Sequence, residues 1–305
     1  MRVRRPSPPG EARGSVFLHL EFNKPFCLPG EELGCRLLIN TEKPLRYKAI
    51  SAELTCCEKF FVEGSRLTKI PHRCVAEISG PGVARPPRKS LCFSISIPCQ
   101  ASPTYVGSSI LRIWRVKALV ELGLAPNISV EEALFVVGSV SQEGRRSAFS
   151  SRGPLRLDIH LKKGLFFPGE ALEGAISLSQ PSAVRSLRVE VLALERLRVE
   201  HFREVSLARC LRRVVLPVKK TAHFILQAPN YSSFIDVCSS ATYVLRAIAS
   251  LKIGGELVAD LPISIGVLRT SGAGGAIRTS GRKHFDLLER KGLRHHLTHV
   301  SPLWS

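Results

Sequence analysis

The sequence contains no run of 18 or more consecutive apolar residues, so it predicts no transmembrane helix. The basic N-terminus MRVRRPSPPGEARGS is not followed by an apolar segment, and we therefore expect no secretory signal. None of the nine cysteines belongs to a Cys-x-x-Cys pair, and their number is odd. We expect reduced, mostly buried thiols in a cytosolic protein, with Cys35, Cys92, Cys210 and Cys238 inside apolar strands.

The usual catalytic signatures are also missing. The chain has no Gly-x-Ser-x-Gly elbow, no phosphate-binding loop and no His-Glu-x-x-His motif. His295, His296 and His299 form HHLTH, and the outer two stand one helical turn apart, a spacing that can hold a metal. No cysteine or carboxylate joins them nearby, so we interpret them as a solvated tail. The sequence thus predicts a protein that is not an enzyme, with no cofactor and no metal.

Acidic residues are few: 25 Asp and Glu stand against 44 Lys and Arg, giving a net charge of +19. Residues 1–14 contribute +3 (four Arg, one Glu) and residues 269–305 contribute +5 (seven Lys or Arg, two Asp or Glu), which leaves +11 for residues 15–268. A basic body attracts phosphorylated peptides, anionic lipid headgroups or nucleic acid. The alternative is a solvated basic surface with no specific ligand.

Alternation of apolar and polar residues dominates, whereas helical periodicity is scarce, so the sequence predicts an all-β fold. In the first half the expected strands are 15–22, 33–39, 49–61, 91–97, 110–122 and 134–140. In the second half they are 155–161, 175–178, 187–198, 210–218, 222–226, 241–250 and 257–266. Two such groups of short strands indicate two tandem immunoglobulin-like antiparallel β-sandwiches.

The domain boundaries follow from composition. We expect a disordered basic N-terminus over 1–14, a sandwich over 15–140, a Ser-, Gly- and Arg-rich linker over 141–154, and a second sandwich over 155–268. The basic tail 269–305 is expected to be partly disordered, with one short amphipathic helix over Lys283 to Thr298.

One phrase occurs twice: FCLPGEELG at 26–34 and FFPGEALEG at 166–174. Further along, IWRVKALV at 113–120 matches TYVLRAIA at 242–249. The same order of features at a nearly constant offset indicates a duplicated domain. Pro-Gly is typical of a turn, because Pro presets φ and Gly accepts a positive φ, so we give the phrase a structural role. Gly34 falls one residue early relative to Gly174, which predicts a local slip or bulge.

These features resemble the arrestin family, especially its arrestin-domain (α-arrestin) proteins. The resemblance covers about residues 15–268 and includes CFSISIPCQASPTYVG at 92–107 and LPISIG at 261–266. It implies an adaptor of the cytosol and the endosomal or plasma membrane, which docks on acidic or phosphorylated tails of membrane proteins and links them to endocytosis and protein transport. Anionic phospholipids, coat components and ubiquitin ligases are the further partners that it implies.

The ligase role is in doubt here, because α-arrestins usually recruit ligases through Pro-Pro-x-Tyr and this chain has none. Its Pro-Pro pairs at 8–9 and 86–87 are followed by Gly-Glu and Arg-Lys. The arrestin-fold subunit of the retromer coat, which needs no such motif, is the nearest relative in role.

Basic residues on strands are the candidate anion-binding groups, since Lys and Arg pair with phosphate. The candidates are Arg112, Arg115, Lys117, Arg196, Arg198, Arg212, Arg213, Lys219 and Lys220. For any one of them a solvated strand face is an equally good interpretation. The alternative function is nucleic-acid binding by two basic β-sandwiches, although no base-reading loop or aromatic stacking strand stands out.

Overall fold

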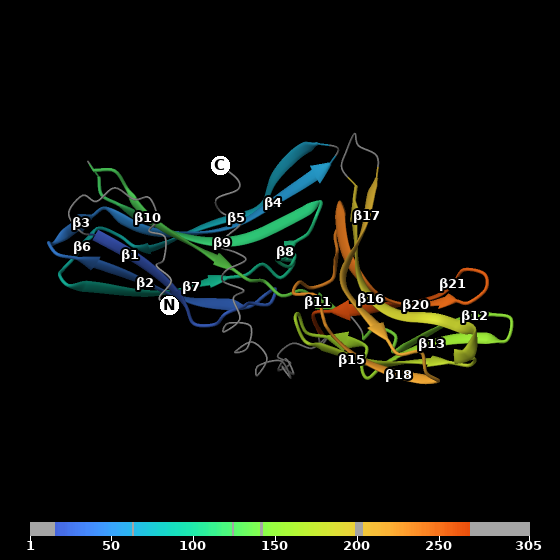
Figure 1. Ribbon diagram of the computed structural model, residues 1–305. Helices are drawn as coiled ribbons and strands as arrows, with labels where there is room; N and C mark the ends of the chain where they lie inside the picture. The colour runs from blue at the N-terminus through green and yellow to red at the C-terminus, as the bar shows by residue number, and fades with distance from the viewer. Residues whose placement is uncertain (1–15, 63, 124, 141–142, 199–203, 269–305) are drawn as a thin grey trace.

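The computed structural model describes residues 16–62, 64–123, 125–140, 143–198 and 204–268. The predictions for the N-terminus and for the tail, including its helix and the three histidines, lie outside the described residues. Within them, the chain is almost entirely β-strand, as the alternating pattern predicts, with one short 3-10 helix, η1 (Pro181–Ala183), and no α-helix. The fold is built mainly from antiparallel sheets, and the pairs β11–β22 and β14–β21 are parallel (Figure 1).

The first half contains a short sheet and a long sheet. The short sheet has the order β1 (Val16–Phe22), β2 (Glu32–Thr41), β7 (Arg88–Ser96). The long sheet has the order β10 (Ile128–Leu134), β9 (Ile110–Glu121), β4 (Ala49–Val62), β5 (Ser65–Ser79), with β8 (Tyr105–Val106) also beside β9. A small ladder joins β3 (Leu45–Tyr47) to β6 (Gly82–Ala84).

The second half repeats this arrangement. Its short sheet has the order β12 (Ser147–Arg152), β13 (Leu155–Leu161), β15 (Ala171–Leu178), β18 (Thr221–Gln227). Its long sheet has the order β14 (Leu165–Phe166), β21 (Glu256–Ile265), β20 (Ser239–Leu251), β16 (Val184–Leu197), β17 (Val205–Leu216), with β19 (Phe234–Ile235) also beside β20. Finally, β11 (Ser139–Val140) and β22 (Val267–Leu268) pair across the two halves.

Strand for strand, β1-β2-β7 corresponds to β13-β15-β18, and β10-β9-β4-β5 corresponds to β21-β20-β16-β17. The repeated sequence features therefore occupy repeated places in the topology. The repeated turn is also built the same way twice, with Gly30 at φ 84° and Gly169 at φ 76°. Both values lie in the left-handed region, where glycine is free of steric cost.

The glutamate that follows each of these glycines has a defined role rather than a merely solvated one. Glu31 accepts a hydrogen bond from the Leu28 amide at 3.0 Å, and Glu170 accepts one from the Phe167 amide at 2.9 Å. A lysine from the preceding strand end pairs with each carboxylate as well: Lys24 in the first half and Lys163 in the second. The repeated phrase is therefore a self-contained turn motif, in which the acidic side chain closes the loop.

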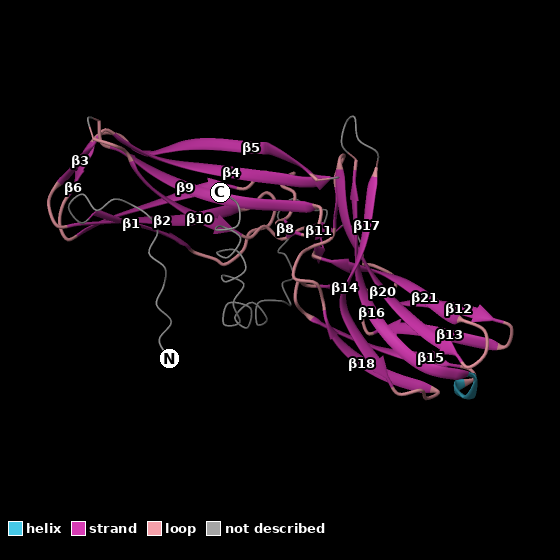
Figure 2. Cartoon of the chain, turned by 45° about the horizontal axis from the view of Figure 1, so that its top comes forward, coloured by secondary structure: helices cyan, strands magenta, loops and turns pink. Residues whose placement is uncertain are grey.

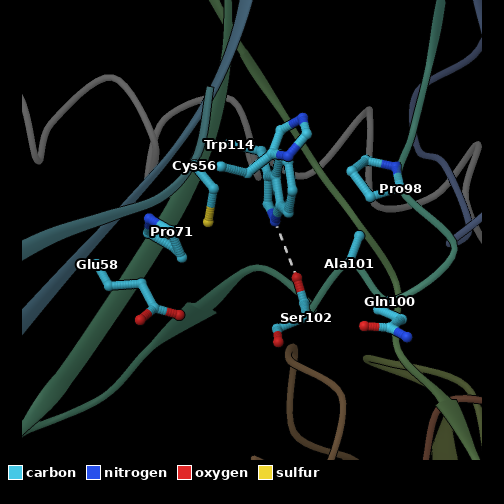
Figure 3. Close-up of a pocket in the computed structure, with 9 residues that line it drawn as sticks. Cys56, Glu58, Pro71, Pro98, Gln100, Ala101, Ser102 and Trp114 are labelled. Atoms are coloured by element: carbon cyan, nitrogen blue, oxygen red, sulfur yellow. Dashed lines mark hydrogen bonds between the residues drawn. The ribbon is translucent and has the colours of Figure 1, made fainter. Parts of the chain in front are cut away.

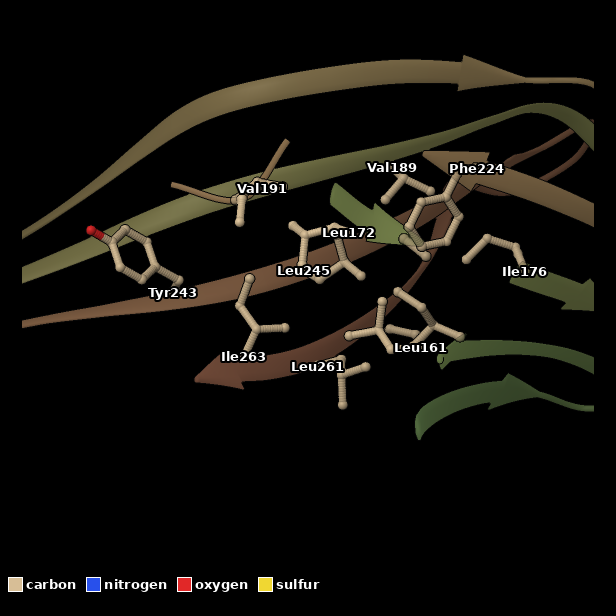
Figure 4. Packing of buried hydrophobic residues seen from close by; sticks show 14 of the residues in the cluster. Leu161, Leu172, Ile176, Val189, Val191, Phe224, Tyr243, Leu245, Leu261 and Ile263 are labelled. Carbon is tan, nitrogen blue, oxygen red and sulfur yellow. The ribbon is translucent and has the colours of Figure 1, made fainter. Parts of the chain in front are cut away.

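The largest core lies between the two sheets of the second half, where Leu172 and Phe224 of the short sheet face Leu245 of the long sheet (Figure 4). Three first-half side chains, Phe60, Tyr105 and Ile110, belong to this same cluster. The long strands of each half thus extend beyond their own short sheet, and their ends pack against the other half. In both views the end of β4 lies next to the end of β16 and the start of β17 (Figures 1 and 2).

Three expectations need correction. The expected linker contains β12, which pairs with β13 from Ser147 to Arg152 and sends Ala148 toward the core, a pattern hidden by its Ser and Arg residues. The segment 134–140 is mostly not strand: Leu134 ends β10, Ser139–Val140 form β11, and the strand that pairs with β9 is β10, which lies earlier in the chain. The thiols are all free but are not mostly buried. Those of Cys27, Cys35 and Cys56 are buried, whereas those of Cys74, Cys92, Cys99 and Cys210 are exposed.

Candidate functional site

Arg112 of β9 lies at the junction between the halves with only 1% of its side chain exposed. Its Nε contacts Glu58 of β4, and its Nη2 lies 2.5 Å from Asp236 Oδ2, in the loop after β19 of the second half. The guanidinium also stacks over the Phe234 ring at 4.4 Å. A buried cation needs compensating charge, and here two carboxylates, one from each half, supply it.

Glu195 of β16 is the matching buried carboxylate of the second half, 2% exposed. The Ser109 amide and hydroxyl donate to its Oε2 at 2.7 and 2.6 Å, and the Ser108 amide and Tyr105 hydroxyl donate to its Oε1 at 2.9 and 3.1 Å. All four donors are neutral groups of the first half. Burial, the neighbouring Tyr243 and this carboxylate raise the pKa of Tyr105 well above its ordinary value, so the phenol keeps its proton and donates.

The junction has an approximate two-fold arrangement that follows from the duplication. Tyr105 begins β8 and Phe234 begins β19, and each of these strands pairs with the equivalent long strand of its half. The two rings meet edge to face, 5.2 Å apart between centroids. Glu58 and Glu195 flank this contact. Glu195 accepts hydrogen bonds from the first half, and Glu58 is linked to Asp236 of the second half through Arg112. The halves are therefore joined by equivalent elements that bear different side chains.

The outer faces of the long sheets carry matching rows of alternating charge. In the first half Glu53, Lys117 and Glu131 stand in register across β4, β9 and β10. In the second half Arg213, Glu190, Arg246 and Asp260 stand in register across β17, β16, β20 and β21. Opposite charges facing each other across strands stabilise a sheet modestly and neutralise one another.

These rows remove several sequence candidates from the set of free cations. Arg115 pairs with Glu131 at 2.7 Å, and Arg213 pairs with Glu190 at 2.7 Å. Lys117 lies between two glutamates of its row. The prediction for Arg112 was wrong. We expected it on an exposed strand face that contacts phosphate, but its side chain is buried, because β9 extends into the junction.

The other five candidates are exposed and make no ion pair with a described carboxylate. Arg196 and Arg198 lie at the end of β16, Arg212 lies on β17, and Lys219 and Lys220 lie in the turn before β18. The structure does not bring them into one cluster. Arg209, also exposed and on β17, was missed because the apolar pattern placed the start of that strand at residue 210.

A pocket of about 250 Å³ adjoins the junction on the first-half side (Figure 3). It is lined by Cys56, Glu58 and Trp114 of the long sheet and by the loop that carries Ser102. The Trp114 indole donates to the Ser102 carbonyl at 2.9 Å, and the Ser102 hydroxyl donates to Asp236 at 3.1 Å. Because its polar lining already takes part in the junction, we regard the pocket as part of that junction.

Over the described ranges, no group of three or more His, Cys, Asp or Glu side chains is arranged to hold a metal ion. In the same part of the chain, no helix has the length and apolar character needed to span a membrane. Comparisons with protein-family models and with curated proteins found no match for this sequence.

Proposed function

We propose that this chain is a non-enzymatic, arrestin-like adaptor that binds acidic or phosphorylated cytosolic tails of membrane proteins and links them to endocytosis or protein transport. The observation that carries the proposal is the duplicated architecture itself. Two β-sandwiches of equivalent topology are joined through a buried polar junction, a design that presents large surfaces in a fixed relation. The resemblance in sequence to arrestin-domain proteins points to the same role.

The distribution of charge supports an anionic ligand. The first-half candidates Arg115 and Lys117 are compensated by their own sheet, whereas five second-half candidates make no ion pair with a described carboxylate: Arg196, Arg198, Arg212, Lys219 and Lys220. An uncompensated arginine gains more from an external carboxylate or phosphate than one that must first give up an internal partner. The second half is therefore the surface that we assign to the tail. In the cell, we place the protein in the cytoplasm, at the periphery of endosomal or plasma membranes.

The test is a titration of the purified chain with a phosphorylated acidic tail peptide, its unphosphorylated form, liposomes with and without phosphoinositide, and duplex DNA, each in rising salt. We expect saturable binding of the peptide, stronger when it is phosphorylated and weakened by salt because the contacts are charged. Binding to DNA alone would favour the nucleic-acid function instead. Failure to bind any of these anions would refute the adaptor proposal in this form.

A further inference from the structure

The strands β5 and β17 occupy the same position in the two halves, at the edge of each long sheet next to β4 and β16. An edge strand presents unpaired backbone groups that can pair with another chain, and proteins commonly protect it with proline or with charged side chains. Pro71 lies inside β5 and has no backbone N–H, at an irregular stretch of its ladder with β4. The β17 sequence, VSLARCLRRVVL, has no proline and no acidic residue. Of the two equivalent edges, β17 is the open one.

Arginines line the open edge on one face. Arg209 pairs in register with Ala193, and Arg212 pairs with Val191, whose side chains are buried and point inward. Residues directly opposite each other in a ladder share a face, so both arginines lie on the inner face. A register shift between Val191 and Leu192 brings them there although they are three residues apart. Both are exposed and unpaired with any described carboxylate.

Charge decides which segment can occupy this edge. The chain's own ends, 1–14 and 269–305, carry net charges of +3 and +5 and would be repelled. A second copy pairing edge to edge would set arginine against arginine, which is destabilising. An acidic segment of another protein meets neither obstacle. The added strand would gain backbone hydrogen bonds from the edge and charge-assisted hydrogen bonds from the two guanidiniums.

We propose that β17 is a docking edge, to which an acidic, extended segment of a partner protein adds as a further strand with its carboxylates facing Arg209 and Arg212. The inference rests on the proposed function and names the place and the mode of binding. Because side chains alternate along a strand, the segment would carry acidic residues at every second position.

The experiment uses the full chain and a capped twelve-residue peptide in which glutamate alternates with valine or threonine. Hydrogen exchange is measured with and without peptide. We expect slower exchange at 205–216 and no change at 65–79. Two further peptides are N-methylated at alternate residues, so that each lacks the backbone donors along one of its two edges. The peptide methylated on the edge that pairs with β17 should lose binding, and the other should retain it. A peptide bound only by charge would tolerate either pattern.

The double variant Arg209→Gln/Arg212→Gln should weaken binding at least tenfold. Its control, Arg188→Gln/Arg246→Gln, removes the same charge from paired arginines on the outer face of the same sheet and should weaken binding less than twofold. Thermal unfolding of each variant checks that the fold is kept.

Peptide binding that protects other strands, or that survives Arg209→Gln/Arg212→Gln, would overturn the docking edge and leave the adaptor function standing. If neither this peptide nor a phosphorylated tail binds, the proposed function fails with it.

Discussion

Glu58 and Glu195 hold the same place in the two halves, but the protein satisfies them in different ways. In register, Glu58 stands opposite Arg112 and Glu195 stands opposite Ala241. The first glutamate is therefore neutralised by an arginine that also reaches Asp236, whereas the second is held by amides and hydroxyls from the opposite half.

This difference shows what duplication preserves and what it leaves free. The strand order, the Pro-Gly turn and the outer rows of charge recur, because each half folds as the same sandwich and each feature contributes to it. The junction is made once per molecule, so its two sides need only complement each other. The first half supplies both the arginine and the neutral donors, and the second half supplies the carboxylates of Asp236 and Glu195 that accept from them.

The largest effect is expected from Arg112→Met. The change leaves Glu58 and Asp236 without their cation, and breaking a buried ion pair from one side costs about 3–5 kcal/mol. Chemical denaturation should show this loss in the free energy of unfolding. Adding Glu58→Gln and Asp236→Asn should restore part of it. A loss below about 1 kcal/mol would mean that the ion pairs do not hold the halves together.

A smaller loss is expected from Glu195→Gln. The amide nitrogen of glutamine would face donors that now point at a carboxylate oxygen, such as the Ser109 amide at 2.7 Å. Leaving buried donors unsatisfied costs about 1–3 kcal/mol. Ser109→Ala should cost less, since the backbone donors remain. If Glu195→Gln were neutral, the assignment of Glu195 as the junction's acceptor would be wrong.

Gly34 and Gly174, which end the two copies of the repeated phrase at non-equivalent positions, should respond unequally to alanine. A Cβ on Gly174 would lie 2.4 Å from the backbone oxygen of His160 and 2.6 Å from the Phe224 ring. A Cβ on Gly34 would meet only the side chain of Asn23, at 2.7 Å, which can rotate away. Gly174→Ala should therefore cost about 1–3 kcal/mol, and Gly34→Ala about 1 kcal/mol or less. Equal thermal unfolding temperatures would remove this distinction.

The smallest effect is a loss of folding stability at alkaline pH, caused by ionisation of the buried thiols; no such loss is expected at neutral pH. Burial raises the pKa of Cys27 to about 11 and the pKa values of Cys35 and Cys56 to about 12. Since the folded pKa exceeds the unfolded value of 9.0, the stability contribution is complete below pH 9 and is lost as the pH rises toward 12. All three thiols lie in the first half.

A thiol reagent at pH 8 provides the measurement. Exposed thiols, among them Cys74 and Cys210, should react at once, and the three buried ones only after denaturant is added. Rapid reaction of Cys56 in the native protein would contradict its buried position between the sheets of the first half.

Sequence reasoning could reach the all-β fold because buried strands alternate clearly, as β13 does from Leu155 to Leu161. It missed β5 altogether, because an edge strand exposed on both faces shows no alternation. The strand β12 escaped for a related reason, since Ser147–Arg152 resembles a linker in composition.

The candidate site was less accessible to prediction. Strand faces could be assigned from parity, and Arg115 and Lys117 do share the outer face. The alternation along one strand does not reveal which residue lies opposite on the neighbouring strand, so the sequence did not predict the ion pair between Arg213 and Glu190. The burial of Arg112 depends on contact between halves that lie more than 100 residues apart in sequence, and no local pattern encodes it.

The central claim is that the unpaired cations of the second half bind the acidic ligand, whereas the paired cations of the first half do not. The most direct measurement compares two charge-matched variants by titration with one phosphorylated acidic peptide. Arg209→Gln/Arg212→Gln/Lys219→Gln should weaken binding at least tenfold, and Arg73→Gln/Arg115→Gln/Lys117→Gln less than twofold. Equal losses would show that only net charge matters and would contradict the account.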